Sequence, residues 1–233
     1  MGRYIVIDLT RFKEGNDDVC TAVIDMETGE CLRPMPYLKG VRVRELNMHP
    51  GAVLEGEITK NIGAENPHIE DASYRDLKYK GPASGEEFKA FLERTLSDSV
   101  ASGFGVPFGE GQKHIPAGQQ AACSIITIRI LPRTLTIHED AYKPGRIKVS
   151  FTDNMGHSYR YLPITDRGFY DYAKKHQDDG QLDKVQSFIL SQEEVYLRIG
   201  VSRQYQSGDR NGYWLQVNGI YTFPSFYKEI RKY

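Results

Sequence analysis

The chain of 233 residues carries 30 Lys and Arg against 31 Asp and Glu, a formal net charge of −1, with 39% apolar and 26% charged residues. This composition is typical of a globular protein and excludes wholesale disorder. It also argues against a general cationic coat for nucleic acid, although a local basic surface remains possible, and no apolar run approaches the roughly 20 residues of a membrane helix.

Strand patterns dominate the first half of the chain. The expected strands are residues 4–9, 19–24, 30–35 and 51–59. The second and third flank Met26-Glu27-Thr28-Gly29, a sequence typical of a hairpin turn. Ser84 and Glu87 have the spacing of a capping box, and the apolar stripe that follows predicts one helix over residues 84–100.

The second half repeats the strand-rich pattern after a segment rich in glycine and proline. The expected strands are residues 123–130, 135–137, 146–152, 157–162, 195–201 and 213–221. Between the fourth and fifth of these, two helical patterns cover residues 165–175 and 182–190, and Thr165 or Asp166 can cap the first.

Short strands with frequent turns favour small barrels over a parallel sheet. We therefore predict a mainly β fold with minor helix, made of two OB-like small barrels joined by a helix and a Gly-rich linker. The expected domains are an N-terminal barrel with its capping helix over residues 1–103, a linker over 104–120 and a C-terminal barrel over 121–233.

The cysteine pattern bears on compartment and on metal binding. Cys20, Cys31 and Cys123 are odd in number and lack a CxxC spacing. This argues against a disulfide framework and a structural zinc site, and it predicts a reduced, cytoplasmic protein. P-loop, nucleophile-elbow and HExxH motifs are absent from the sequence, so it gives no positive case for catalysis and predicts no cofactor.

The strongest functional signal lies near the C-terminus. Residues 195–233 hold six basic residues against two acidic ones, together with nine aromatic residues. Cations that follow phosphates and rings that stack on bases are the groups that bind single-stranded nucleic acid. Strand alternation predicts that Leu215 and Val217 are core. The exposed candidates for nucleic-acid binding are Arg198, Arg203, Tyr205, Trp214, Gln216 and Asn218, although the rings could equally serve barrel packing.

Two other clusters are weaker candidates. Arg33, Lys39, Arg42 and Arg44 form a basic run that could line a groove, of which Arg33 is the preferred ligand contact, or could be a solvated loop. His68, Glu70 and Asp71 could hold a divalent ion or perform acid–base chemistry. A structural role is favoured for this cluster, with His68 or Asp71 bonded to the backbone or paired with Arg33.

Three segments together resemble a known family. They are residues 20–25 with 31–34, residues 67–71, and Leu197-Arg198-Ile199-Gly200-Val201-Ser202-Arg203 with residues 214–221. This combination resembles the dual OB-fold domain of prokaryotic conflict and mobile-element proteins. Leu32 and Ala72 depart from that pattern, since a tryptophan is expected before Arg33-Pro34 and an aromatic residue directly after Glu70-Asp71. The resemblance implies two OB-like barrels over nearly the whole chain and a role in binding nucleic acid or nucleotides.

The hypothesis from sequence is therefore a non-catalytic module that binds nucleic acid, single-stranded by preference, or a nucleotide. Two alternatives remain open. One is a metal-dependent hydrolase that acts on nucleic acid or nucleotides through His68, Glu70 and Asp71. The other is a subunit that binds protein partners through its aromatic face.

Overall fold

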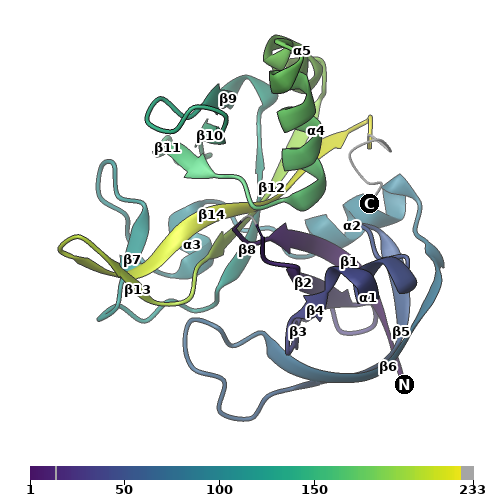
Figure 1. Ribbon diagram of the computed structural model, residues 1–233. Helices are drawn as coiled ribbons and strands as arrows, with labels where there is room; N and C mark the ends of the chain where they lie inside the picture. The colour runs from purple at the N-terminus through teal and green to yellow at the C-terminus, as the bar shows by residue number, and fades with distance from the viewer. Residues whose placement is uncertain (14, 227–233) are drawn as a thin grey trace.

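The computed structural model describes residues 1–13 and 15–226 (Figure 1). Strands make up 44% of the chain and helices 20%, so the predicted mainly β fold with small barrels is confirmed. The N-terminal half forms a closed five-stranded barrel, and the C-terminal half forms a curled half-barrel. None of the described helices is long and apolar enough to cross a membrane.

The first barrel closes because its first strand pairs on both edges. Its strands are β1 (Gly2–Arg11), β2 (Asp18–Asp25), β3 (Cys31–Met35), β5 (Ala52–Lys60) and β6 (Asp71–Pro82). They follow the order β1-β5-β6-β3-β2, and β2 returns to β1. The β3–β6 pair is parallel, whereas the other four pairs of the ring are antiparallel. Short β4 (Leu38–Lys39) and α1 (Gly40–Glu45) connect β3 to β5.

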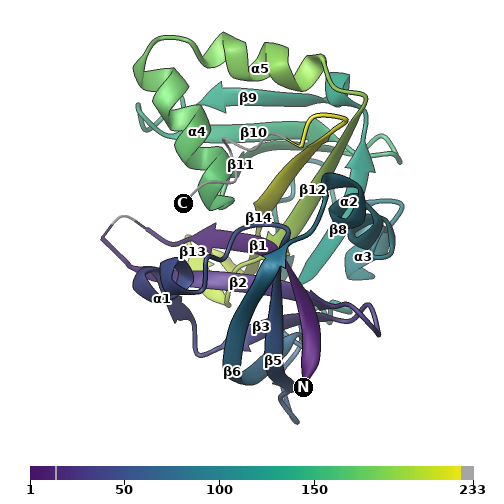
Figure 2. The same cartoon turned by 90° about the vertical axis from the view of Figure 1, so that its right-hand side faces the viewer.

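The strands of the second half are connected in the same order as those of the first barrel, but they form two sheets and not one closed barrel (Figure 2). Its main strands are β8 (Ile125–Ile130), β9 (Leu135–Glu139), β10 (Ile147–Thr152), β11 (Ser158–Pro163), β12 (Glu194–Val201) and β14 (Arg210–Phe223). One sheet has the order β11-β10-β9, and the other contains β14-β12-β8. A parallel bridge between Ile164 and Val217 joins them, and the turn η1 (Pro132–Thr134) separates β8 from β9. Helices α4 (Arg167–Asp178) and α5 (Leu182–Leu190) connect β11 to β12.

Local chemistry sets several of these boundaries. In the β2–β3 turn, the Asp25 carboxylate accepts from the backbone N–H of Glu27 and Thr28, each at 2.9 Å, and Gly29 supplies a left-handed φ of +78°. The predicted capping box is confirmed: Ser84 accepts from Glu87 N at 3.1 Å, and Glu87 accepts from Ser84 N at 2.8 Å.

The single helix predicted over residues 84–100 is wrong. Helix α2 (Gly85–Glu93) ends early, and a second helix, α3 (Val100–Phe104), begins with its own capping box at Ser99. Between them, Leu96 forms a bridge to Thr127 of β8, and Ser97 N donates to Thr127 O at 2.8 Å. The backbone leaves the helix because these residues pair with the second half instead.

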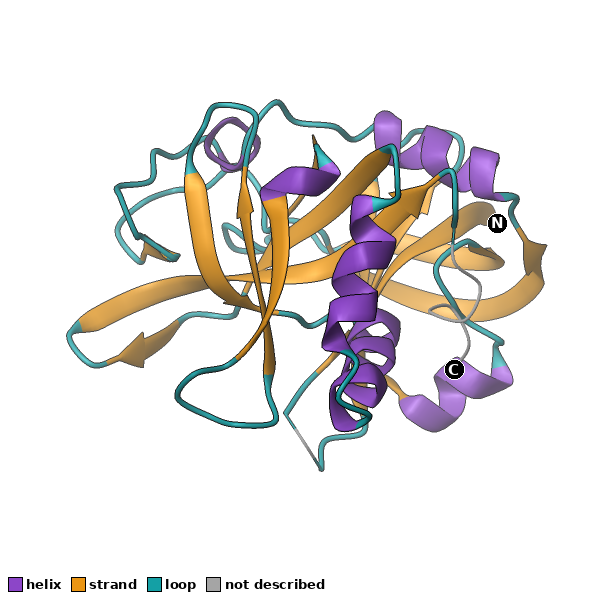
Figure 3. Ribbon diagram, turned by 90° about the horizontal axis from the view of Figure 1, so that it is seen from above, coloured by secondary structure: helices purple, strands orange, loops and turns teal. Residues whose placement is uncertain are grey.

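The segment predicted as a linker, residues 104–120, packs on the second half. Phe104, Val106 and Ile115 are buried in its core. Strand β7 (His114–Pro116) pairs with β14 and lies beside the hairpin of β13 (Tyr205–Ser207) and β14, which projects at one side of the molecule (Figures 1 and 3). The domain boundaries themselves stay a prediction.

A shared apolar cluster joins the two halves. On β1, Tyr4 and Val6 face the interior of the first barrel, whereas Ile5 and Ile7 face outward into a separate buried cluster. That cluster also contains Tyr196 of β12, Tyr221 of β14 and Phe88 of α2. The apolar run at residues 4–7 is therefore a strand buried on both faces, as in a sheet covered on both sides.

Candidate ligand-binding pocket between the barrels

A pocket of about 310 Å³ lies where the two halves meet. The first barrel contributes the end of β1, β2, β3 and the β5–β6 loop, and the second half contributes the end of β12, the segment leading into β13, and β14. Its volume is at the lower end of the range of roughly 300–1,000 Å³ for small-ligand sites. We call it the inter-barrel pocket.

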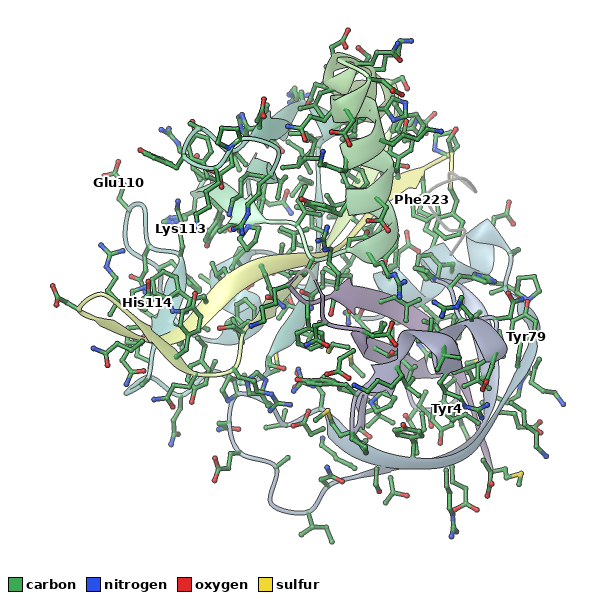
Figure 4. The ribbon with its side chains drawn as sticks, viewed as in Figure 1. Tyr4, Tyr79, Glu110, Lys113, His114 and Phe223 are labelled. Atoms are coloured by element: carbon green, nitrogen blue, oxygen red, sulfur yellow. The ribbon has the colours of Figure 1, made fainter. Side chains whose placement is uncertain are left out.

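The pocket collects five of the seven residues predicted to bind nucleic acid, although they come from strands far apart in sequence. These residues are Arg33, Arg203, Tyr205, Gln216 and Asn218. Trp214 lies next to it: its ring packs on Tyr205 at 5.6 Å between centroids and on His114 at 5.0 Å, the latter stacked at 24°. Figure 4 shows His114 on the side of the β13–β14 hairpin, far from Tyr79 of the first barrel. Lys228, Arg231 and Lys232 of the basic C-terminal segment lie outside the described residues.

The expectation that Arg198 is exposed is wrong. Its side chain is 1% exposed and binds Asp8, from Nε to both carboxylate oxygens at 3.0 and 3.2 Å. It also donates from Nη1 to Thr127 Oγ1 at 2.8 Å. The alternation of β12 does place Arg198 outside its own barrel, but the first barrel covers that face. The guanidinium therefore holds the two halves together and cannot reach a ligand at the surface.

Asn218 is also buried, against expectation, at 4% exposure. Its Oδ1 accepts from Thr165 Oγ1 at 3.0 Å and from Gln216 Nε2 at 3.1 Å. Its amide lies over Gly200, where an added Cβ would come within 2.2 Å of Asn218 Nδ2. Leu215 and Val217 are core as predicted. Strand alternation changes phase at Asn218 because β14 has a β-bulge there: Arg198 pairs with Gly219 and Ile199 with Val217, which leaves Asn218 as the extra residue.

Arg33 is buried at the inner end of the pocket, at 4% exposure. Its Nε donates to Asp71 Oδ1 at 2.6 Å, and its Nη1 donates to Ser124 Oγ at 3.1 Å. Its Nη2 is buried and has no hydrogen-bond partner among residues 1–13 and 15–226. A buried guanidinium nitrogen without an acceptor destabilises the folded protein. This N–H group is therefore available to donate a hydrogen bond to a ligand.

His68, in the β5–β6 loop, also lines the pocket at 6% exposure. Within the described part of the chain its ring nitrogens have no well-formed hydrogen bond, although the Ser202 backbone contacts the ring, which packs edge-on against Tyr213 at 5.9 Å between centroids. Burial lowers the pKa of His68 to about 3, with repulsion from Arg33 and Arg203 adding to it and with Asp71 and the Ser202 backbone opposing it. The imidazole is therefore neutral at physiological pH, with one donor and one acceptor nitrogen.

The two carboxylates beside His68 have protein partners. Glu70 accepts from Ser124 N and Ser124 Oγ, each at 2.7 Å, and so fixes the β5–β6 loop to the start of β8. Asp71 pairs with Arg33, as predicted, and with Arg203 Nη2 at 2.8 Å. Among residues 1–13 and 15–226, no three His, Cys, Asp or Glu side chains form a group suited to a metal ion.

The outer wall of the pocket is exposed and aromatic. Arg203 is 45% exposed on its side chain and donates from Nε to Tyr37 Oη at 3.3 Å, and Tyr205 is 50% exposed. Arg11, Phe12 and Tyr37, each half-buried, also line the pocket and were missed from sequence. The adjacent basic and aromatic residues at the end of the first strand were the available signal, since that strand leads into a turn at the barrel rim.

The cysteine at the pocket is a protonated thiol. Burial raises the pKa of Cys20, and of Cys31 and Cys123, the last to about 12. All three are free thiols. Because the thiolate is the nucleophile, none is activated for covalent chemistry.

No protein-family model matches the chain, and no curated protein is significantly similar to it.

Proposed function

We propose that this protein is a non-catalytic module that binds single-stranded nucleic acid or a nucleotide in the inter-barrel pocket. The observation that carries the proposal is the convergence of cations, aromatic rings and amides on one pocket from separate strands. Cations suit phosphates, rings suit the faces of bases, and amides suit base edges. The engagement of Glu70 and Asp71 by protein donors favours binding over the hydrolase alternative.

The connectivity supports an OB-like identity for both halves. If the five barrel strands of each half are numbered in chain order, their order around the ring is 1-2-3-5-4. The third strand pairs in parallel with the fifth, by a bridge beside the strand end in the second half. In both halves helical structure lies between the third and fourth strands. In the second half, β8 and β9 together take the place of the first strand. OB-like barrels bind oligonucleotides on strands 2 and 3 and on the loops that join strands 1–2 and 4–5. The inter-barrel pocket uses these parts of the first barrel, including Phe12, Arg33 and His68.

The sequence resemblance to the dual OB-fold domain of prokaryotic conflict and mobile-element proteins agrees with this proposal. It extends the proposal to a cytoplasmic protein that recognises nucleic acid or nucleotides in such a system. The adjacent rings of Tyr205, Trp214 and His114 beside the pocket supply an aromatic surface along which a strand could continue.

Fluorescence anisotropy with labelled oligonucleotides tests the proposal. At low salt, a single-stranded thymidine decamer should bind saturably and more tightly than a duplex of the same length, and it should be recovered uncut. Absence of binding to the decamer and to mononucleotides would overturn the proposed function. Equal affinity for the duplex would overturn the single-strand preference.

A further inference from the structure

The inner end of the inter-barrel pocket holds buried nitrogen atoms without partners on two side chains. Within the described residues, the buried Arg33 Nη2 has no hydrogen-bond partner, and the buried ring nitrogens of His68 have a contact with the Ser202 backbone that lies outside normal hydrogen-bond geometry. The two side chains come from β3 and from the β5–β6 loop, and both line the same pocket. Native proteins satisfy most buried polar atoms, so unsatisfied donors that converge on one pocket indicate a missing acceptor ligand.

The charges around the pocket select an anion. Its lining includes Arg11, Arg33 and Arg203 and contains neither Asp nor Glu. The nearby Asp71 is already shared between two of these arginines. A second pocket, at the β1–β2 turn, provides a contrast because three acids there, Asp17, Asp18 and Asp171, balance its cations. Of these two pockets, the inter-barrel pocket is the one whose described lining residues lack an acid and include buried nitrogens without partners.

The burial of the inner end of the pocket indicates that it binds the end of a ligand and not its middle. Arg33 and His68 at the inner end are 4% and 6% exposed, whereas Tyr205 at the outer wall is 50% exposed. An internal phosphodiester must have chain on both sides and needs two exits, but a terminal group needs one. Exposed side chains such as Tyr205 change rotamer on a ps–ns timescale, so the outer wall can open for entry.

We propose that the inner end of the inter-barrel pocket binds the terminal phosphate of a nucleotide, either free or at the end of a single strand, through Arg33 Nη2 and a ring N–H of His68. This inference rests on the proposed function and names the part of the ligand that is recognised. A phosphate monoester offers several charged acceptors to donors that are already in place, and charge-assisted bonds of this kind are stronger than neutral ones. Because His68 is neutral, one ring nitrogen donates its N–H to a phosphate oxygen, and the other can accept a hydrogen bond from a protonated phosphate oxygen.

Two cations of the basic run at residues 33–44 that do not line the pocket are already paired with acids. Lys39 pairs with Asp18 at 2.5 Å, and Arg42 pairs with Glu45 at 3.0 Å. Paired cations on the surface attract phosphates weakly. Binding of a strand along many phosphates needs many unpaired cations, whereas recognition of its end needs few. The paired state of these cations therefore favours recognition of an end.

Four probes test the proposal: a thymidine decamer with a 5′-phosphate, one with a 3′-phosphate, the unphosphorylated decamer, and thymidine 5′-monophosphate. Wild-type protein should bind at least one phosphorylated decamer about tenfold or more tightly than the unphosphorylated one, the ratio expected for a charge-assisted contact. Arg33→Lys retains the cation and removes Nη2, and His68→Phe fills the ring site without nitrogen. Each should abolish the preference, so that the phosphorylated and unphosphorylated decamers bind the variant with equal affinity. Arg75→Lys, at an exposed arginine paired with Glu57, is the matched control and should retain it.

Each outcome supports or overturns the terminal-phosphate contact, the proposed function, or both. Equal binding of all three decamers overturns terminal recognition and leaves the proposed function intact. Absence of binding by all four probes overturns both terminal recognition and the proposed function. Binding of the monophosphate without the decamers supports the inference with a free nucleotide as ligand and removes strand binding from the proposed function. A preference that survives in both Arg33→Lys and His68→Phe overturns the assigned contacts, provided that thermal unfolding shows both variants folded.

Discussion

Arg198 of β12 and Asp8 of β1 form an ion pair across the interface between the two halves, with each side chain 1% exposed. Burial raises the pKa of Asp8, and Arg198 opposes that effect. Removing one member of such a pair leaves an uncompensated charge in the interior, which is far more costly than losing a surface pair.

Arg198→Ala should therefore lower the free energy of unfolding by about 3–5 kcal/mol, measured by urea denaturation. Arg75→Ala, which breaks the exposed pair with Glu57, should change it by about 1 kcal/mol or less. The apolar double variant Asp8→Leu/Arg198→Met should recover much of the loss. An Arg198→Ala protein as stable as the Arg75→Ala control would show that the pair does not hold the halves together.

The sequence was sufficient to predict most strands and both long helices because their patterns are local. Helix α5 (Leu182–Leu190) has the predicted limits, and α4 begins after the predicted cap, Asp166. It was not sufficient for β6 (Asp71–Pro82), whose mainly polar residues include few that are buried. Such a strand is fixed by its pairing with β5 and β3, and pairing partners are not encoded in local periodicity.

The candidate site was predicted in part for the same reason. Arg203 and Tyr205 were identified because residue type and a polar turn are visible in the sequence. Arg198 was assigned to an outer face of β12 that the other half of the protein covers, and nothing local to β12 reveals that cover. Asn218 was assigned by regular alternation, but it is the extra residue of a β-bulge in β14. The unpartnered ring of His68 likewise depends on how the β5–β6 loop packs against Tyr213.

Tyr205 is the aromatic residue of the pocket best suited to test stacking, because it is half exposed. Tyr205→Ala should weaken binding of a single-stranded decamer by about 1–3 kcal/mol, the range for one stacked base, and leave the melting temperature nearly unchanged. Tyr142→Ala removes a tyrosine that is 94% exposed outside the pocket and should leave binding intact. Equal affinities for the two variants, measured by anisotropy, would remove Tyr205 from the binding surface.

Arg203 should contribute through a phosphate. For single strands, the slope of log affinity against log salt concentration changes by about 0.7 for each phosphate neutralised. Arg203→Ala should flatten that slope by about this amount, and Arg75→Ala should leave it unchanged. If both variants retain the wild-type slope in titrations at several salt concentrations, Arg203 makes no phosphate contact.

The low pKa of His68 should appear in the acid sensitivity of the protein. Below its ordinary pKa of 6.5, the imidazole binds a proton in the unfolded chain but stays neutral in the folded protein down to about pH 3. The folded state therefore loses stability as pH falls through this window, by up to about 1.4 kcal/mol per pH unit for one proton.

His68→Phe should make this pH dependence shallower between pH 6 and pH 4, and near pH 7 it should be as stable as wild type or more stable, since it removes an unsatisfied polar group. Urea denaturation at several pH values measures both effects. The pKa values of His114 and His138 are also lowered by burial, but these residues are common to both proteins. Parallel pH profiles would mean that His68 titrates normally in the folded state.

Hydrogen–deuterium exchange with and without a single-stranded 5′-phosphorylated decamer tests the location of the ligand most directly. If the inter-barrel pocket is the binding site, amides in residues 66–71 and 201–206 should exchange more slowly with the ligand present. These segments contain His68, Arg203 and Tyr205. The loop over residues 140–146, which lies outside the pocket, should be unaffected. Protection confined to other segments, with residues 66–71 and 201–206 unchanged at saturating ligand, would contradict the assignment of the pocket.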